Sequence, residues 1–140
     1  MRVFLDANVL SSAAYRETGS VRVFFPLARA GACTLVSSAY ALDEARRNIR
    51  AKHPGRLPDL EMLAAQLEVC GEPTAHTLAG LATSGLPEKD APILAAAIDA
   101  KCHLLVTGDR THFGKLFGRR IKGTVVLLPL DAIGILVGEA

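Results

Sequence analysis

Four acidic side chains stand in or directly after apolar stretches of the sequence, and their positions suggest one shared site. They are Asp6, Glu44, Asp90 and Asp109. Asp6 and Asp109 each follow a short apolar run that is typical of a β-strand. Ligand sites of open parallel sheets lie just beyond the carboxyl ends of the strands, so we expect these two carboxylates to be neighbours. Glu44 and Asp90 lie early in two predicted helices, whose ends can reach the same edge of a sheet.

Carboxylates that are brought together repel one another and lose hydration, so a cation must compensate them. Oxygen ligands suit Mg²⁺ or Mn²⁺, and the sequence has no plausible His/Cys set for zinc. A carboxylate-held ion of this kind suits phosphate esters, because it lowers the pKa of an attacking water and neutralises charge on the phosphate. The four acids therefore predict metal-dependent hydrolysis of a phosphate ester.

Four apolar runs are expected to form the strands that position these acids. They cover residues 2–5, 33–36, 103–107 and 124–128. None alternates strictly between apolar and polar residues, which is typical of strands buried on both faces of a parallel sheet. Helical patterns separate them and cover residues 20–30, 38–52, 57–69, 74–83 and 88–101, with a further helix after Pro129. This alternation predicts a single α/β domain over residues 1–140.

Composition supports a compact soluble domain. The 140 residues are 50% hydrophobic and 21% charged, which excludes a disordered or fibrous chain. Sixteen basic and fourteen acidic side chains leave a net charge of +2, which allows a phosphate-rich partner without requiring one. The three cysteines lack a CxxC spacing and indicate a reducing compartment. With neither a signal peptide nor a membrane-length apolar run, we expect a cytoplasmic protein with no membrane partner.

Each acid also has a possible structural role that needs no metal. Asp6 could cap the helix after the first strand, and Asp109 could form an Asx turn. Glu44 could belong to an exposed, ion-paired helix face, and Asp90 could complement the dipole at a helix N-terminus. Singly these signals are weak, and it is the order and context of all four that favour a common site.

Four segments, in the expected order, carry a resemblance to a known family. They are Val-Phe-Leu-Asp-Ala-Asn at 3–8, Leu-Asp-Glu-Ala-Arg at 42–46, Glu-Lys-Asp-Ala-Pro-Ile-Leu-Ala-Ala-Ala at 88–97, and Leu-Val-Thr-Gly-Asp at 105–109. With these segments the chain resembles the PIN domains, a family that includes the VapC-like toxin ribonucleases of toxin–antitoxin pairs. The resemblance implies a three-layer α/β/α sandwich with a small, mostly parallel sheet. It also implies a Mg²⁺- or Mn²⁺-dependent endoribonuclease that cleaves RNA.

The resemblance assigns roles residue by residue. It places the catalytic and metal-binding quartet at Asp6, Glu44, Asp90 and Asp109, and supporting hydrogen bonds at Asn8 and Thr107. For the two supporting residues, a helix cap and a strand end are the alternatives. In the expected mechanism three aspartates surround the metal, and Glu44 ligates it or orients the water that attacks phosphorus in line. Cleavage then leaves a 5′-phosphate and a 3′-hydroxyl.

One departure from the family pattern lies directly after the Thr-x-Asp motif. Many PIN domains have a further Asp there, whereas residues 110–113 are Arg-Thr-His-Phe in this chain. A fifth carboxylate is missing, so the number of metal ions stays open. A lone histidine is usually an ordinary surface or packing residue, and His112 is not included in the expected ligand set.

Basic residues form two groups that could contact an RNA backbone. The first follows Glu44 along its helix, and the second covers residues 115–122. We expect nucleic-acid contacts from Arg46, Arg47, Arg50 and Arg110. A solvated surface explains many of these charges equally well. Base-stacking platforms are not evident, because the chain has no Trp, five Phe and two Tyr.

Two other functions compete with nuclease activity. A haloacid-dehalogenase-like phosphatase needs an Asp two residues after the first, and Asn8 stands there, so this class fits poorly. A non-catalytic PIN-like module for RNA binding or scaffolding is the stronger alternative. The apolar segments 21–27 and 57–67 could serve a homodimer or an antitoxin partner, although core packing explains them as well.

Overall fold

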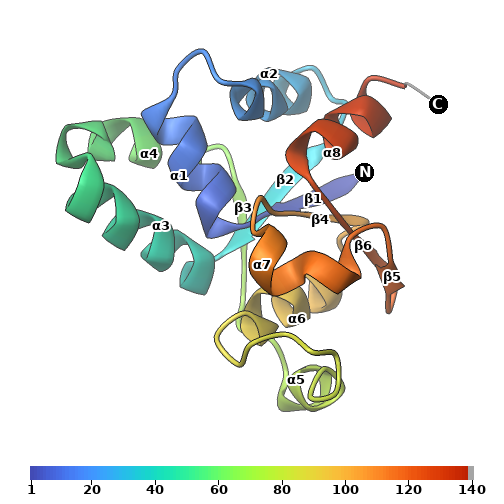
Figure 1. Ribbon diagram of the computed structural model, residues 1–140. Helices are drawn as coiled ribbons and strands as arrows, with labels where there is room; N and C mark the ends of the chain where they lie inside the picture. Colours follow the sequence, from blue (N-terminus) through green and yellow to red (C-terminus); the bar gives the residue numbers. More distant parts are fainter. Residues whose placement is uncertain (139–140) are drawn as a thin grey trace.

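The computed structural model describes residues 1–138, which fold around a six-stranded sheet. Figure 1 shows this sheet with helices on both of its faces. The strands are β1 (Arg2–Leu5), β2 (Thr34–Ser38), β3 (Glu68–Cys70), β4 (Leu104–Val106), β5 (Arg120–Ile121) and β6 (Thr124–Leu127). Their order across the sheet is β3-β2-β1-β4-β6-β5. Every pairing is parallel except that of β5 with β6.

The central strands are apolar on both faces, as their unbroken hydrophobic runs predict. In β1, Val3 and Leu5 belong to the core on one face, whereas Phe4 belongs to the core on the other. In β4, Leu104 and Val106 share the face of Val3 and Leu5. Successive side chains of a strand point to opposite faces, so a strand covered on both sides cannot alternate with polar residues.

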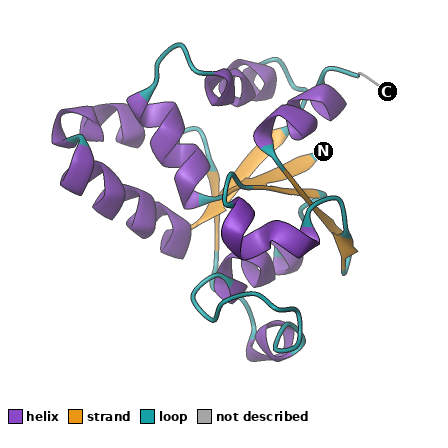
Figure 2. Cartoon of the chain, viewed as in Figure 1, coloured by secondary structure: helices purple, strands orange, loops and turns teal. Residues whose placement is uncertain are grey.

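Helices cover both faces, and the expected three-layer α/β/α architecture is confirmed (Figure 2). The first face carries α1 (Ala7–Tyr15), α2 (Phe24–Arg29), α3 (Ala39–Lys52), α4 (Leu57–Ala64) and α8 (Pro129–Leu136). The second face carries α6 (Ala91–Asp99) and α7 (Arg110–Phe113), with α5 (Ala75–Ala79) packed against α6. Short 3-10 turns, η1 (Ser20–Val23), η2 (Pro54–Arg56) and η3 (Gly114–Leu116), join some of these helices. Within residues 1–138, no helix is long and apolar enough to cross a bilayer.

Local sequence explains where two of the helices begin. Ser38 caps α3, because its hydroxyl oxygen accepts a hydrogen bond from the amide of Ala41 at 3.1 Å. Pro92 lies in the first turn of α6, where the missing amide proton leaves no helical hydrogen bond unmade. Both starts lie at the edge of the sheet where β1 and β4 end.

The largest error of the sequence prediction lies in residues 57–69. The predicted helix is wrong beyond Ala64, where α4 ends, and residues 68–70 form β3 at the edge of the sheet. A helical stripe is a local signal, whereas β3 exists because Val36 of β2 pairs with Glu68. The helix expected at 20–30 also begins as a 3-10 turn. Those expected at 74–83 and 88–101 are shorter, and α7 and β5 had no predicted counterpart.

Candidate metal centre at the ends of β1 and β4

The order in which the chain adds strands to the sheet reverses after β3, and the site lies where this reversal places β4 next to β1. The chain runs from β1 to β2 and β3 on one side, and then returns to place β4 against the other side of β1. Crossovers that leave in opposite directions open a crevice at the carboxyl ends of the two central strands. Asp6 follows β1 there, and residues 107–109 follow β4. The amide of Asp6 donates to the carbonyl of Val106 at 3.0 Å, which fixes the two strand ends together.

Asp6 is buried, with 4% of its surface exposed. Its Oδ1 accepts from the amide of Ala7 at 2.7 Å, so it caps α1, while its Oδ2 accepts from the hydroxyl of Thr107 at 2.8 Å. Burial raises the pKa of Asp6 to about 6, although both hydrogen bonds oppose the rise; the charges of Glu44 and Asp90 add to it. Oδ1 of Asp6 therefore caps α1, while Oδ2 links the end of β1 to the residue that follows β4.

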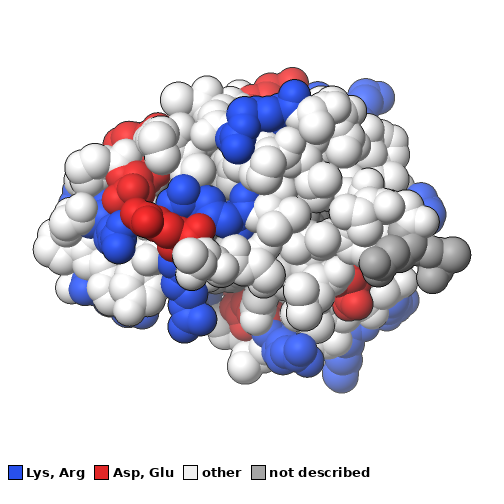
Figure 3. Space-filling view, turned by 90° about the horizontal axis from the view of Figure 1, so that it is seen from above, with Lys and Arg blue, Asp and Glu red and all other residues white. Residues whose placement is uncertain are grey.

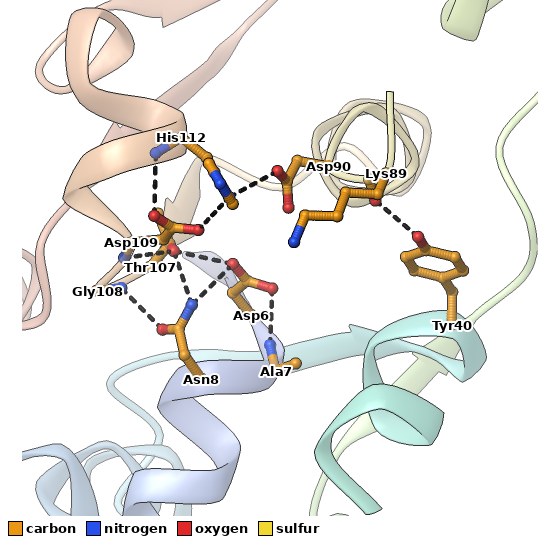
Figure 4. A network of polar contacts seen from close by, with 10 residues as sticks. All are labelled: Asp6, Ala7, Asn8, Tyr40, Lys89, Asp90, Thr107, Gly108, Asp109 and His112. Carbon is orange, nitrogen blue, oxygen red and sulfur yellow. Dashed lines mark hydrogen bonds and ion pairs between the residues drawn. The ribbon is translucent and has the colours of Figure 1, made fainter. Parts of the chain in front are cut away.

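Asn8 and Thr107 both donate hydrogen bonds to the carboxylate of Asp6 (Figure 4). The side-chain amide of Asn8 donates to Oδ2 of Asp6 at 3.2 Å and lies 3.1 Å from the hydroxyl of Thr107. Its carbonyl oxygen accepts from the amide of Gly108 at 2.8 Å, and the Thr107 hydroxyl accepts from the amide of Asp109 at 3.1 Å. These contacts hold the turn after β4 against the start of α1.

Asp90 and Asp109 face each other across a histidine. Nδ1 of His112 lies 2.7 Å from Oδ2 of Asp109 and 3.0 Å from Oδ2 of Asp90. Ligand atoms of these three residues lie within 4.8 Å of one another. Asp109 also caps α7, since its Oδ1 accepts from the amide of His112 at 3.0 Å. Histidine was not included in the sequence-based ligand set, and only its position three residues after a helix-capping Asp could have indicated this contact.

Asp90 does not act as an ordinary helix cap. It precedes α6, yet its side chain makes no capping hydrogen bond, and its Oδ2 is a buried atom without a hydrogen-bond partner. Burial raises the pKa of Asp90, whereas electrostatic interactions with His112 and Lys89 lower it and that with Asp109 raises it further. The carboxylate of Asp90 therefore does not cap α6 and lies against His112, close to Asp109.

Tyr40, on α3, and Lys89, next to Asp90, connect α3 to the acidic cluster. The Tyr40 hydroxyl donates to the carbonyl oxygen of Lys89 at 2.6 Å, which links α3 to the residue before Asp90. The side chain of Lys89 extends toward the acidic groups in Figure 4. Burial raises the pKa of the Tyr40 phenol, and the charges of Glu44 and Asp90 raise it further while Arg47 lowers it.

Glu44 lies at the periphery of the cluster. It is half-buried on α3, and its charge acts on both Asp6 and Tyr40. Among residues 1–138, neither a hydrogen bond nor an ion pair involves its carboxylate. This arrangement does not favour the alternative of an ion-paired helix face. The structure thus gathers Asp90, Asp109 and His112 most tightly, sets Asp6 beside them, and places Glu44 within electrostatic range.

The four arginines expected to contact nucleic acid differ in their surroundings. Arg46 is engaged by Glu61, with Nε at 2.8 Å and Nη2 at 2.9 Å from its two carboxylate oxygens. Arg47, Arg50 and Arg110 are exposed and take part in none of the ion pairs within residues 1–138. On the face shown in Figure 3, acidic side chains lie beside the basic ones, so this face has no continuous basic surface. Arg46 is therefore the member of this set least available to a ligand.

The family model described as PIN domain matches residues 2–111, which include Asp6, Glu44, Asp90 and Asp109. The chain belongs to the PIN domain family. A comparison with curated proteins finds no match.

Three solved structures have a similar fold. VapBC2 from Rickettsia felis, bound to a DNA fragment from its own promoter, has a TM-score of 0.68 and 19% identity, over 91% of this chain and 98% of that chain. PAE2754 from Pyrobaculum aerophilum has a TM-score of 0.66 and 18% identity, over 98% of this chain and 90% of that chain. FitAB bound to an IR36 DNA fragment has a TM-score of 0.61 and 20% identity, over 91% and 94%. At these identities the likeness establishes the fold.

Proposed function

We propose that this protein is an endoribonuclease that uses Mg²⁺ or Mn²⁺ to hydrolyse RNA phosphodiester bonds, as the toxin of a toxin–antitoxin pair. The observation that carries the proposal is the proximity of Asp6, Asp90 and Asp109 beyond the carboxyl ends of β1 and β4 (Figure 4). They come from the end of β1, the start of α6 and the end of β4. Membership of the PIN domain family supports the same activity.

The donor atoms of the crevice fit a hard divalent cation. One carboxylate oxygen of the cluster, Oδ2 of Asp90, is buried and lacks a hydrogen-bond partner in residues 1–138. A buried polar atom without a partner is costly unless a ligand satisfies it. Asp6, Asp90 and Asp109 would hold the ion, with Glu44 as a further ligand. Bound there, Mg²⁺ or Mn²⁺ would acidify a water molecule and neutralise charge on the scissile phosphate.

The protein side chains would position the reactants. The hydroxyl of Thr107 and the amide of Ala7 hold the carboxylate of Asp6 in one orientation, and Asn8 supports both Asp6 and the turn at Gly108. The carboxylate of Glu44 forms no ion pair within residues 1–138. If it does not ligate the ion, it can accept a hydrogen bond from the attacking water and so orient it. Attack in line would leave a 5′-phosphate.

The proposed antitoxin partner has separate support. Two of the similar solved structures carry names of toxin–antitoxin pairs, VapBC2 and FitAB, and both are bound to DNA fragments. We propose that this chain likewise pairs with an antitoxin in the cytoplasm, and that RNA is its substrate. The exposed Arg47, Arg50 and Arg110 are the side chains proposed to contact the RNA backbone.

The test is cleavage of a labelled RNA by the purified chain with Mg²⁺, Mn²⁺ or EDTA. Cleavage with either ion and none with EDTA is expected, and a DNA of the same sequence should stay intact. Asp90→Asn should lower the cleavage rate at least about a hundredfold, since it removes a charged ligand. Glu88→Gln, two residues away and exposed, is the matched control and should cleave like the wild type.

Two results would overturn the proposal. Cleavage that persists in EDTA, or that Asp90→Asn leaves unchanged, would contradict the assigned site. Binding of RNA without cleavage in either metal would instead favour a non-catalytic RNA-binding module. Induced expression in a bacterial host tests the toxin role, because growth arrest by the wild type should be relieved by Asp90→Asn.

A further inference from the structure

His112 lies at the centre of the carboxylate cluster, and its position is fixed by the backbone. The Arg-Thr-His-Phe sequence after Asp109 forms α7, and the cap at Asp109 holds the amide of His112 at 3.0 Å. An i, i+3 spacing on a helix brings two side chains to the same face. The imidazole therefore lies between Asp109 and Asp90, as Figure 4 shows.

The contacts of this imidazole are close but do not have the geometry of hydrogen bonds. Nδ1 lies 2.7 Å from Asp109 and 3.0 Å from Asp90, yet neither contact has hydrogen-bond angles, and Nδ1 is buried without a partner. Oδ2 of Asp90 is also buried without a partner, on a residue only 8% exposed. If the imidazole merely bridged two acids as a cation, one N–H would point at one oxygen. Nδ1 of His112 and the Oδ2 atoms of Asp90 and Asp109 lie close together without an N–H directed at either oxygen. This arrangement fits three ligands of one metal ion.

We propose that His112 binds the metal ion through Nδ1, which makes the site a mixed carboxylate–imidazole site that favours Mn²⁺ over Mg²⁺. The inference rests on the proposed function, because it concerns the metal of that same site. Mg²⁺ strongly prefers oxygen ligands, whereas divalent first-row transition metals accept imidazole nitrogen. In this chain the imidazole would stand near the place where many relatives have a further carboxylate.

The direct test needs no variant. Mn²⁺ bound to the purified full chain should show, by pulsed electron paramagnetic resonance, the ¹⁴N modulation of a coordinated imidazole. Modulation that is absent while Mn²⁺ is bound would overturn the inference and leave the proposed metal site intact. If neither Mn²⁺ nor Mg²⁺ binds, the proposed function and the inference fail together.

Variants then measure the preference. His112→Ala should weaken Mn²⁺ binding about tenfold or more while changing Mg²⁺ binding less than about threefold, so that the Mn²⁺/Mg²⁺ affinity ratio falls. His76→Ala, an exposed histidine on α5, should leave both affinities unchanged. His112→Asn, which supplies an oxygen donor in place of the imidazole nitrogen, should keep the Mg²⁺ affinity of the wild type but should not restore its Mn²⁺/Mg²⁺ ratio. A ratio in His112→Ala equal to that of the wild type would contradict ligation by the imidazole.

Discussion

The hydroxyl group of Thr107 donates to Oδ2 of Asp6 at 2.8 Å, and this bond joins the ends of the two central strands. Thr107 is fully buried and also accepts from Asn8 and from the amide of Asp109. One hydroxyl thereby orients a candidate ligand at the end of β1 and the turn that carries the next candidate ligand after β4.

Thr107→Val should destabilise the folded protein by about 1–3 kcal/mol, because it leaves buried polar groups without partners. In the wild type, the hydrogen bond from Thr107 lowers the pKa of Asp6. Its loss in Thr107→Val should therefore raise this pKa above about 6. Denaturant unfolding measures the first effect. Thr111→Val, an exposed position on α7, is the control and should change stability by less than about 0.5 kcal/mol. Equal stability of the two variants would contradict the bridging role of Thr107.

The metal-free protein should lose stability as the pH rises from about 4 to about 7. Burial raises the pKa of Asp6 from the ordinary 3.8 to about 6, so in this window the folded state binds more protons than the unfolded chain. The free energy of unfolding therefore falls with rising pH, by up to about 3 kcal/mol for this group. The raised pKa of Asp90 acts in the same direction.

Unfolding curves of the metal-free protein at several pH values test this dependence. Asp6→Asn should flatten it, because the variant has no charge to bury at this position. Asp131→Asn changes an exposed acid in the first turn of α8 and should keep the wild-type slope. Equal pH dependence in the wild type and in Asp6→Asn would show that burial does not raise the pKa of Asp6.

Tyr40→Phe should weaken Mn²⁺ binding severalfold while leaving the fold intact. The Tyr40 hydroxyl holds the carbonyl of Lys89 at 2.6 Å, and Asp90 follows directly. Loss of the bond lets the start of α6 shift relative to α3, and metal affinity depends on such positioning. Metal titration measures the effect. Tyr15→Phe, whose ring stacks on His53 at 3.7 Å, is the control with no expected change in affinity.

Arg46→Ala and Arg47→Ala, at adjacent positions on α3, should have different effects. Arg46 is held by Glu61 in a partly exposed pair, so its loss should cost less than about 1 kcal/mol of stability and little RNA affinity. Arg47 is exposed and close enough to influence the pKa of Tyr40. Its loss should lower RNA affinity severalfold and reduce the salt dependence of binding by about one charge.

Binding of a labelled RNA across a salt series, together with denaturant unfolding, separates the two arginines. The Asp90→Asn protein can serve as background, so that RNA is bound without being cut. A larger loss of RNA affinity in Arg46→Ala than in Arg47→Ala would mean that the ion pair with Glu61 opens when RNA binds.

Much of the architecture follows from local signals in the sequence. Strands β1, β2, β4 and β6 lie within two residues of the predicted runs, because unbroken apolar segments bounded by polar residues must be buried on both sides. The placement of Asp6 and Asp109 at strand ends followed from the same runs. The error at residues 57–69 arose where a helical stripe and an edge strand compete for the same residues, and only the pairing of Val36 with Glu68 distinguishes them.

The amino-acid sequence by itself determined which segments are buried, where the strands end, and therefore which acids stand at the edge of the sheet. These are consequences of local hydrophobicity and chain geometry. Tertiary structure decided the contacts between distant segments: that His112 joins Asp90, that Arg46 is engaged by Glu61, and that Glu44 remains unpaired within residues 1–138. Such contacts depend on how the elements pack in space, and no pattern along the chain records the direction in which a side chain will find its partner.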